Sequence, residues 1–309
     1  MEKVAIVILN YLNYIDTIEC VESIPVDQYP AKEIIIVDNG STNDSREQLE
    51  KKYRNRNGIH LVLSDQNEGF ARGNNLGIRY ATESLGCKFV LLVNNDTLFE
   101  DPRMITTLME SYEPGVGVLG PRIITADGDD QNPAARNVIR SRRKQYWHYS
   151  RIIIRTMYKR TAFYQTIRKL NFLKKLRKPK VKHKNPDLKT CTSIKMKLHG
   201  SCFMLTPDFF KYYPYLFPET FLYFEEEILT ILTYKVDLAK KFVHITHIFH
   251  KEHMSTKMSF DYAKRIRTGY RLHSLKMARK IYPLEYDAVI NRYFPEIVDK
   301  EYSKKELTI

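Results

Sequence analysis

Residues Phe89 to Asp96 read FVLLVNND, five apolar residues followed at once by two amides and a carboxylate. A run of five apolar residues predicts a buried strand. The polar residues that follow it place oxygen ligands at the carboxyl end of that strand. In open α/β sheets, ligands bind outside the carboxyl ends of the strands. The stretch therefore predicts an α/β fold with a polar site where this strand ends.

Other apolar runs extend the same pattern over the first half of the chain. Residues 4–10, 33–41, 59–64 and 115–121 also read as strands, separated by polar stretches compatible with helices. Two of these strands end in polar residues as well, at Asn10–Tyr11 and at Asp38–Asn39. The alternation predicts a mostly parallel central sheet flanked by helices, with the polar strand ends brought together.

The net charge of +14 is concentrated in one segment of the 309 residues. Residues 136–189 hold 19 Lys and Arg and one acidic residue, so subtracting their +18 leaves about −4 for the rest. Within this segment, apolar and aromatic residues recur at spacings of three, four and seven, which predicts a basic amphipathic helix. A partner with negative charge, or a solvated helical arm, explains such a segment.

Several classes of protein are excluded by what the sequence lacks. No G-x-G-x-x-G follows the first strand and no P-loop motif occurs, which argues against a dinucleotide fold and a P-loop ATPase. Four scattered cysteines without C-x-x-C spacing argue against a disulfide framework or a structural zinc site. No apolar run approaches the length of a membrane span, and we expect neither a signal peptide nor secretion.

The acidic strand ends admit two explanations. Asp38, Asp65 and Asp96 each follow a predicted strand, where a carboxylate can simply cap the next turn or helix. Three such residues on one edge also suit a hydroxyl-bearing ligand or a hard cation bridging to phosphate. Near them, residues 67–81 offer Gly69, Gly73 and Gly77 at four-residue spacing, which is typical of close helix packing or of backbone approach to a ligand.

Two further groups carry ionisable side chains. Glu225, Glu226 and Glu227 open a predicted helix directly after the apolar FLYF, so at least one carboxylate is expected at the border of the core. Burial near like charges raises a carboxyl pKa, which suits a general base. His244, His247, His250 and His253 form the second group, and spacing alone does not select a metal ligand among them.

Eight motifs in order resemble the family 2 glycosyltransferases of GT-A fold, above all the bacterial rhamnosyl- and galactofuranosyl-type transferases of surface polysaccharide synthesis. They are VILNY, VDNGST, NEGFARGNNLGI, LLVNNDT, DGDDQN, HGSCFML, FLYFEEEIL and HKEHMST. They span residues 4–256, with a break across the basic segment. The resemblance implies an inverting transfer of a sugar from a nucleotide donor to a hydroxyl group of a glycan or lipid-linked acceptor.

By this resemblance, each candidate site residue has a role. Asp96 and His250 match the ligands of a divalent cation, Mg²⁺ or Mn²⁺, and Glu226 matches the base, with Glu225 or Glu227 as alternatives. The positions expected to contact the UDP or dTDP donor are Asn10, Tyr11, Asp38, Asn67, Gly69, Arg72, Asn75, Asn94 and Asn95. Asn94 stands where the family has the first Asp of its D-x-D motif.

The resemblance also divides the chain. We expect a nucleotide-sugar-binding half in residues 1–135, a basic amphipathic insertion in 136–190, an acceptor and catalytic half in 191–260 and a helical C-terminal extension in 261–309. We further expect a cytoplasmic protein attached peripherally to the inner face of the membrane, where anionic lipids attract the basic segment. Two alternatives remain, a metal-dependent nucleotidyltransferase and a nucleic-acid-binding protein that uses the basic segment.

Overall fold

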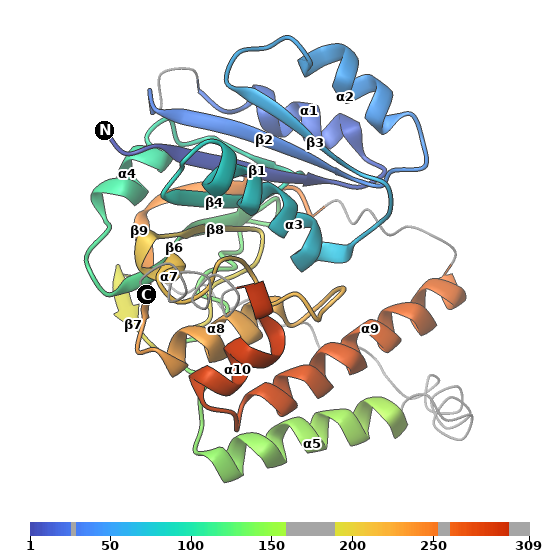
Figure 1. Ribbon diagram of the computed structural model, residues 1–309, viewed down its shortest axis with the longest axis vertical. Helices are drawn as coiled ribbons and strands as arrows, with labels where there is room; N and C mark the ends of the chain where they lie inside the picture. Colours follow the sequence, from blue (N-terminus) through green and yellow to red (C-terminus); the bar gives the residue numbers. More distant parts are fainter. Residues whose placement is uncertain (26–28, 159–188, 253–259, 297–309) are drawn as a thin grey trace, which may run out of the picture.

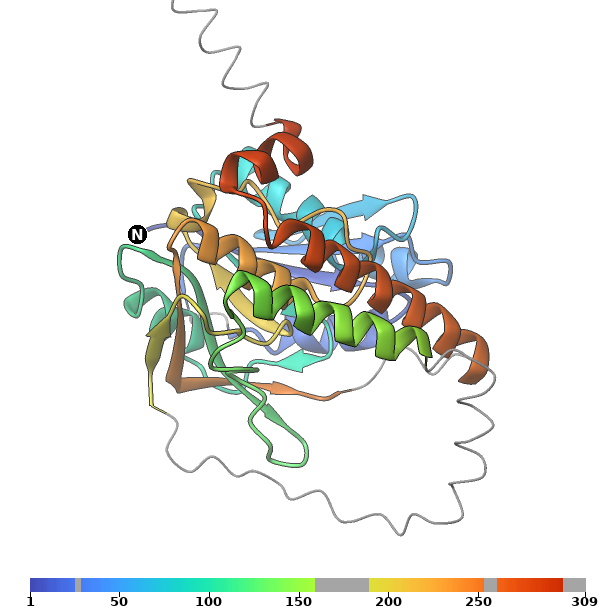
Figure 2. The same cartoon turned by 90° about the horizontal axis from the view of Figure 1, so that it is seen from below.

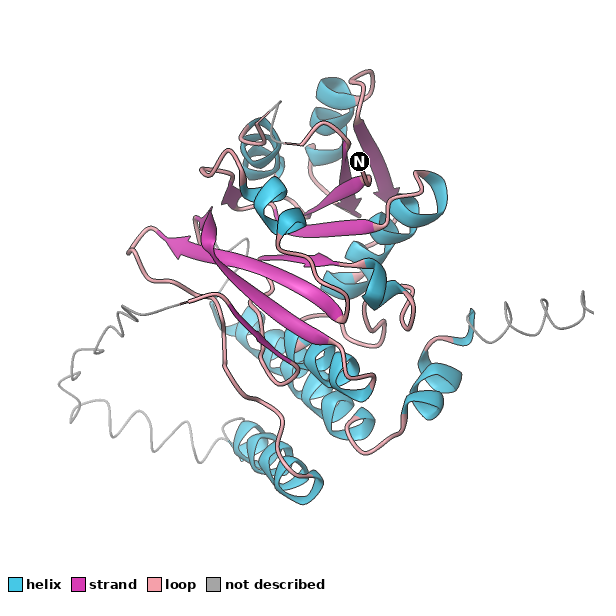
Figure 3. Ribbon diagram, turned by 90° about the vertical axis from the view of Figure 1, so that its left-hand side faces the viewer, coloured by secondary structure: helices cyan, strands magenta, loops and turns pink. Residues whose placement is uncertain are grey.

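The structure, a computed structural model, describes residues 1–25, 29–158, 189–252 and 260–296. One sheet runs through it in the order β3-β2-β1-β4-β8-β6-β9-β5, and β7 pairs with β9 beside this path. The strands are β1 (Val4–Asn10), β2 (Lys32–Asn39), β3 (Ile59–Ser64), β4 (Phe89–Asn94), β5 (Thr97–Leu98), β6 (Val116–Thr125), β7 (Cys191–Ser193), β8 (Cys202–Leu205) and β9 (Ala239–His250). Figure 3 shows these strands with helices on both sides.

Helices connect and cover the strands (Figure 1). They are α1 (Tyr14–Glu22), α2 (Ser45–Tyr53), α3 (Gly69–Arg79) with a π-helical turn η1 (Tyr80–Ser84), α4 (Met104–Glu110), α5 (Arg142–Tyr158), α7 (Pro207–Phe210), α8 (Glu225–Lys235), α9 (Phe260–Ile281) and α10 (Tyr286–Tyr293).

The sheet confirms the predicted fold class and adds antiparallel pairs to it. β3, β2, β1 and β4 are parallel neighbours, and β6 and β9 are also parallel. β8 lies antiparallel between β4 and β6, and β5 lies antiparallel to β9. As a result the carboxyl ends of β1, β2 and β4 meet at one edge, as the sequence predicts.

Each face of the sheet has its own hydrophobic core. Ile6, Ile8 and Ile36 point to the face covered by α1, α2 and α4, whereas Val7 and Ile35 point to the face covered by α3, α8 and α9. Successive side chains of a strand alternate between faces, so near-continuous apolar strands are buried on both sides. This double burial fixes the strand register and so the position of the polar strand ends.

Two of the three spaced glycines allow close packing of α3. A Cβ atom on Gly77 would lie 2.4 Å from Val7 Cγ1, and one on Gly73 would lie 2.8 Å from Leu9 Cδ1. Both contacts are too short for any side chain, so these glycines let α3 lie directly against β1. Packing accounts for Gly73 and Gly77 without a ligand.

The basic segment contributes α5, which packs along α9 in the outermost layer below the sheet (Figures 1 and 2). Tyr149 and Ile153 of α5 are buried in the same core cluster as Leu275 of α9. The predicted amphipathic helix is therefore present over residues 142–158, while residues 159–188 lie outside the described part. Among the described helices, none combines the length and the apolar character that a membrane crossing demands.

Candidate active site

The ends of β1 and β2 form one hydrogen-bonded polar group. Asn10 pairs in register with Asp38, and Asn10 Nδ2 donates to Asp38 Oδ2 at 3.2 Å. The backbone N–H of Ser41 donates to Asp38 Oδ1 at 2.8 Å, and Thr17 Oγ1 donates to Asn10 Oδ1 at 2.8 Å. Both Asp38 oxygens are thus held in place, and each keeps a lone pair with which a carboxylate can accept from a ligand hydroxyl. Tyr11 follows directly and is half-buried.

A second polar group fixes the loop before α3. Asn39 Nδ2 donates to Asn67 Oδ1 at 3.1 Å and to the Gly69 carbonyl at 3.0 Å. Gly69 has φ of +78°, and a Cβ atom there would lie 2.2 Å from the Phe221 carbonyl oxygen. Only glycine fits this left-handed conformation and this close approach. Asn67 and Gly69 therefore hold the loop against the 221 region, while Asp65 is exposed.

Arg72 and Asn75 face the segment before α8. Arg72 Nε donates to the Pro218 carbonyl at 2.8 Å, and its guanidinium lies 3.6 Å from a Glu219 carboxylate oxygen. Asn75 is buried, and its amide both donates to and accepts from the backbone of Leu216, at 2.8 and 2.9 Å. The family resemblance implies that both residues contact the donor. In this structure the Asn75 amide instead joins α3 to the backbone of Leu216. Of the two residues, only Arg72 has an exposed side chain that a ligand could reach.

The turn after β4 explains the polar end of FVLLVNND. The strand ends at Asn94, whose carbonyl accepts from Thr97 Oγ1 at 2.8 Å. Asn95 is buried, and its Nδ2 donates to Thr17 Oγ1 and to the Asn13 carbonyl of the α1 N-terminus. Through Thr17, this turn is connected to Asn10 and Asp38. Asn94 and Asn95 thereby shape the turn that presents Asp96.

Asp96 and His250 lie together. Asp96 Oδ1 is 3.3 Å from His250 Nε2, and the two side chains are 13% and 11% exposed. β5, which follows Asp96, pairs with the end of β9, and the Lys251 N–H donates to the Asp96 carbonyl. Pairing of these two strands thus brings residues that are far apart in sequence to one point.

Gln131 orients His250. Gln131 Nε2 donates to Glu252 Oε1 at 2.6 Å, which leaves Gln131 Oε1 facing His250 Nδ1 at 2.8 Å. A neutral His250 that donates from Nδ1 keeps the lone pair of Nε2 directed toward Asp96. Metal-binding histidines commonly donate their second ring N–H to such a partner.

The pair suits a divalent cation. Two ligands at about 2.1 Å from one octahedral cation are about 3 Å apart, close to the observed separation. Within the ranges that the structure describes, no three His, Cys, Asp or Glu side chains gather as a metal cluster. Two protein ligands leave positions for phosphate oxygens and water, which is the usual arrangement for Mg²⁺ at a phosphate site.

Structure also separates His250 from the other histidines. His244 Nδ1 accepts from the Thr190 backbone N–H at 2.9 Å, and His247 lies 3.7 Å from a Glu100 carboxylate. His253 lies outside the described residues. Spacing alone left this choice open, because alternate residues of β9 point to different sides and only pairing with β5 identifies the one beside Asp96.

His199 and Gly200 connect the Asp96–His250 pair to the glutamates. The His199 and His250 rings pack edge to face with centroids 5.9 Å apart. Burial, followed by the neighbouring His250, lowers the pKa of His199 to about 4, so this ring is neutral at physiological pH. A Cβ atom on Gly200 would lie 2.5 Å from Glu226 Oε1. Glu226 therefore extends over Gly200, the residue that follows His199.

The three glutamates at the start of α8 have different surroundings. Tyr223 and Phe224 both have positive φ, so the chain turns sharply into the helix. Glu227 is buried, accepts from Tyr149 Oη at 2.9 Å and lies 3.6 Å from Lys197 Nζ. Burial, followed by the charge of Glu226, raises the pKa of Glu225 to about 8. Glu227 is thus the buried carboxylate, Glu225 is half-buried with its Oε1 enclosed, and Glu226 is the one positioned by Gly200.

Gln131, His199 and Gly200 lie within the sequence motifs and Thr17 lies outside them, but no pattern gave any of the four a part in the site. Gln131 lies in DGDDQN and His199–Gly200 lie in HGSCFML. Gln131 contacts His250 across 119 residues, and the contacts of the other three residues likewise depend on tertiary packing, which spacing does not report.

Comparisons with known proteins identify relatives of this chain. The family described as "Glycosyl transferase family 2" matches residues 4–180. A low-salt glycan biosynthesis hexosyltransferase, Agl10 of Haloferax volcanii, is 25% identical over 73% of this chain and 60% of its own length. A glycosyltransferase, GlyG of Streptococcus pneumoniae, is 26% identical over 42% of each chain. The chain thus spans less than two thirds of the length of either relative.

The fold has a solved counterpart. A crystal structure of GalNAc-T7 with UDP, GalNAc and Mn²⁺ superposes with a TM-score of 0.54, covering 96% of this chain and 58% of that one at 14% identity. At this identity the likeness establishes the GT-A fold alone. The family match covers more than half of the chain, and the chain therefore belongs to glycosyl transferase family 2.

Proposed function

We propose that this chain is a metal-dependent, inverting glycosyltransferase that moves a sugar from a UDP- or dTDP-sugar to a hydroxyl group of a glycan or lipid-linked acceptor, in polysaccharide synthesis. The Asp96–His250 pair, joined through His199 and Gly200 to Glu226, carries the proposal. Ion ligands and a carboxylate base then border one site, as displacement of a nucleoside diphosphate requires.

The donor nucleoside is assigned to the ends of β1 and β2. Asp38 is held by Asn10 and Ser41, so its carboxylate is pre-positioned to accept from ribose hydroxyls, with Tyr11 and Asn67 beside it. A preorganised acceptor loses little entropy when a ligand binds. Asn75 and Gly69 are assigned a supporting part, because their polar groups already hold the loop and the 216 region.

The diphosphate is assigned to the Asp96–His250 pair. A divalent cation bound there would offset the charge that develops on the leaving diphosphate. Gln131 fixes the ring of His250, and Asn95 fixes the turn that carries Asp96, so both ligands are oriented before the donor arrives. Arg72, partly exposed on α3, is the remaining candidate cation for a phosphate oxygen.

Glu226 is assigned as the base that takes the proton of the acceptor hydroxyl. An alcohol is a weak nucleophile until a carboxylate removes its proton. Glu225, with its raised pKa, is protonated at neutral pH and is therefore unsuited to that role there. The Glu227 carboxylate is held by Tyr149 and Lys197.

We retain the proposed division of the chain after residues 135, 190 and 260. We also retain the proposal that the protein acts at the inner face of a membrane.

Reaction products test the proposal. The purified protein is incubated with UDP- or dTDP-sugars, Mn²⁺ or Mg²⁺ and a glycan acceptor, and the released nucleotide and the anomer of the product are determined by NMR. Release of UDP or dTDP with inversion, abolished by EDTA, is expected. Release of pyrophosphate would instead identify a nucleotidyltransferase, and retention at the anomeric carbon would overturn the single-displacement mechanism.

A further inference from the structure

Helix α5 carries an exposed stripe that combines cations with large apolar side chains. Arg143, Trp147, Arg151, Ile154 and Tyr158 follow one another at spacings of three and four residues, so they lie on one face of the helix. All five are exposed, and Trp147 and Ile154 are 60% and 64% exposed. We call these five residues the outer stripe of α5.

The opposite face of α5 packs against the rest of the protein. Gln145, Tyr149 and Ile153 are buried against the body of the protein. Arg279 of α9 lies 4.3 Å above the Tyr146 ring, which adds a cation–π contact between the two helices. The outer stripe is therefore presented on a helix whose other side is anchored, and its apolar residues are not there to complete the core.

Charge on this layer has one sign. Between residues 142 and 158 there are five Lys and Arg and no acidic residue, and the same holds for residues 266–281 of α9. Among the described residues, no carboxylate forms an ion pair with Arg143, Arg151 or Arg155. The layer attracts a polyanion, because no neighbouring charge neutralises these arginines.

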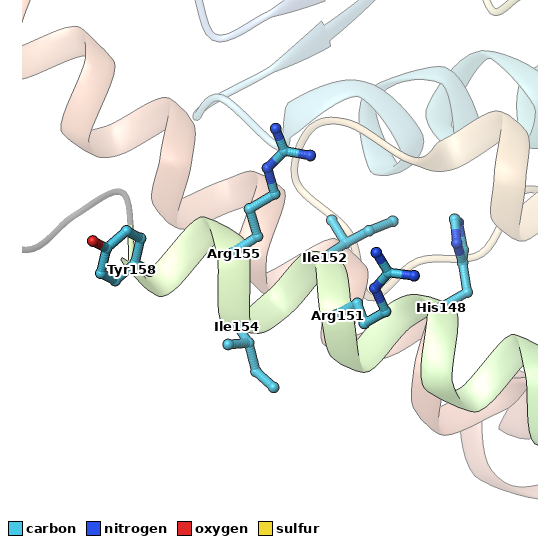
Figure 4. Close-up of a pocket in the computed structure, with 6 residues that line it drawn as sticks. All are labelled: His148, Arg151, Ile152, Ile154, Arg155 and Tyr158. Atoms are coloured by element: carbon cyan, nitrogen blue, oxygen red, sulfur yellow. The ribbon is translucent and has the colours of Figure 1, made fainter. Parts of the chain in front are cut away.

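A hollow of about 530 Å³ adjoins the stripe (Figure 4). It is lined by His148, Arg151, Ile152, Ile154, Arg155 and Tyr158, so cations and aliphatic side chains share one surface. In Figure 4 Ile154 extends to the side of α5 away from the neighbouring ribbons. A headgroup phosphate beside an acyl chain matches this mixture of guanidinium and aliphatic groups.

We propose that the outer stripe of α5 docks the protein on an anionic lipid bilayer. Arginines would contact headgroup phosphates, while Trp147 and Ile154 would enter the boundary between headgroups and acyl chains. A nucleic acid would also attract the arginines, but it offers no apolar layer for the exposed isoleucine of the stripe. The apolar residues therefore favour the bilayer.

This docking rests on the proposed function for its purpose. The inner face of α5 is joined to the helix that carries the candidate base, because Tyr149 Oη donates to Glu227 next to Glu226. A bilayer on the outer stripe would therefore hold α8 in a fixed orientation to the leaflet. Lipid-linked acceptors would then be presented to Glu226 rather than captured from solution.

Vesicle flotation of the full chain tests the proposal. Binding to phosphatidylcholine vesicles with and without phosphatidylglycerol is measured for the wild type, for Arg143→Gln/Arg151→Gln and for Trp147→Ser/Ile154→Ser. Each cation contributes about fivefold, so the first variant, which lacks two, should lose about 25-fold in affinity for the anionic vesicles. The second variant should also bind less, and its deficit should persist at high salt, where charge is screened.

A matched control carries the same loss of charge elsewhere. Lys51→Gln/Arg54→Gln removes two exposed cations at the C-terminal end of α2, at the other end of the molecule from α5 (Figure 1), and should bind vesicles like the wild type. Equal losses in the control and the stripe variants would overturn the proposal. So would indifference of the wild type to phosphatidylglycerol, or stripe-dependent binding of duplex DNA or RNA without binding of vesicles.

Thermal unfolding with UDP and Mn²⁺ on the same samples separates this proposal from the proposed function. A stripe variant that loses the vesicles but keeps its nucleotide-dependent stabilisation places the defect in docking alone. Vesicle binding without any nucleotide response would leave docking intact and remove the transferase assignment.

Discussion

Asp96 Oδ1 and His250 Nε2 lie 3.3 Å apart, at the point where β5 pairs with the end of β9. A carboxylate and an imidazole at this distance either attract each other directly or share a cation. The Gln131 contact at Nδ1 leaves His250 Nε2 facing Asp96, which is the geometry that a shared cation would need.

Replacing His250 separates these two possibilities. His250→Ala should weaken Mn²⁺-dependent binding of UDP by at least tenfold, measured by calorimetry with and without EDTA, because one of two protein ligands is lost. His247→Ala is the matched control, since His247 is on the same strand but faces Glu100. Equal affinities of the two variants for UDP with Mn²⁺ would argue against a cation at His250.

Gln131 should act through His250 rather than on the donor. Gln131→Leu removes the acceptor for His250 Nδ1 and is expected to cost about 10- to 100-fold in metal affinity. Titration of Mn²⁺ followed by electron paramagnetic resonance measures this directly, without turnover. A variant with unchanged Mn²⁺ affinity but impaired folding would assign Gln131 a structural part only.

The sequence predicted the fold well because burial on both faces leaves a strong pattern. The parallel strands from Val4 to Asn94 are apolar runs, and each expected polar end lies at the predicted edge. Asn75 shows the limit of the same reading. An amide on a helix beside a predicted site looks like a ligand contact, yet its partner is the backbone of Leu216, 141 residues away.

Two further features could not be predicted from the sequence pattern. Three adjacent glutamates give no signal of which is buried, because the answer depends on Tyr149 of α5 and on the left-handed Tyr223 and Phe224 before α8. Likewise, the apolar residues of α5 predict an amphipathic helix without saying which of them face α9. Ile153 is buried and Ile154 is exposed, and only packing distinguishes these neighbours.

Glu226 is expected to be needed for chemistry and not for donor binding. Glu226→Gln keeps the shape of the side chain but cannot take a proton, so transfer should fall by about 10² to 10⁴-fold. UDP affinity in the presence of Mn²⁺ should remain within about twofold of the wild type. That change in binding free energy is smaller than the loss of a single hydrogen bond would cause. Retained transfer by this variant would move the base to another residue.

Glu225 should make stability depend on pH. Burial, followed by the charge of Glu226, raises its pKa to about 8 from the ordinary value of 4.5, so the folded protein holds this proton while the unfolded chain releases it. Stability from this group is complete below pH 4.5 and declines as pH rises to 8, by about 1.4 kcal/mol per pH unit. Glu225→Gln should therefore gain stability over the wild type at pH 8 and match it near pH 5, in denaturant unfolding at both values. A difference that grows toward low pH would contradict the assignment.

Gly200 should control the position of Glu226. In Gly200→Ala the new Cβ atom would lie 2.5 Å from Glu226 Oε1, so the carboxylate must move. The tip of a flexible side chain can do this at little cost in stability, whereas misplacing a reacting group by about 1 Å can cost about 100-fold in rate. We expect kcat to fall strongly with little change in melting temperature or UDP affinity. Gly269→Ala is the matched control, because a Cβ atom there meets nothing within 4 Å. If Gly200→Ala kept full kcat, Glu226 would not need its present place over Gly200, and the case for it as the base would fail.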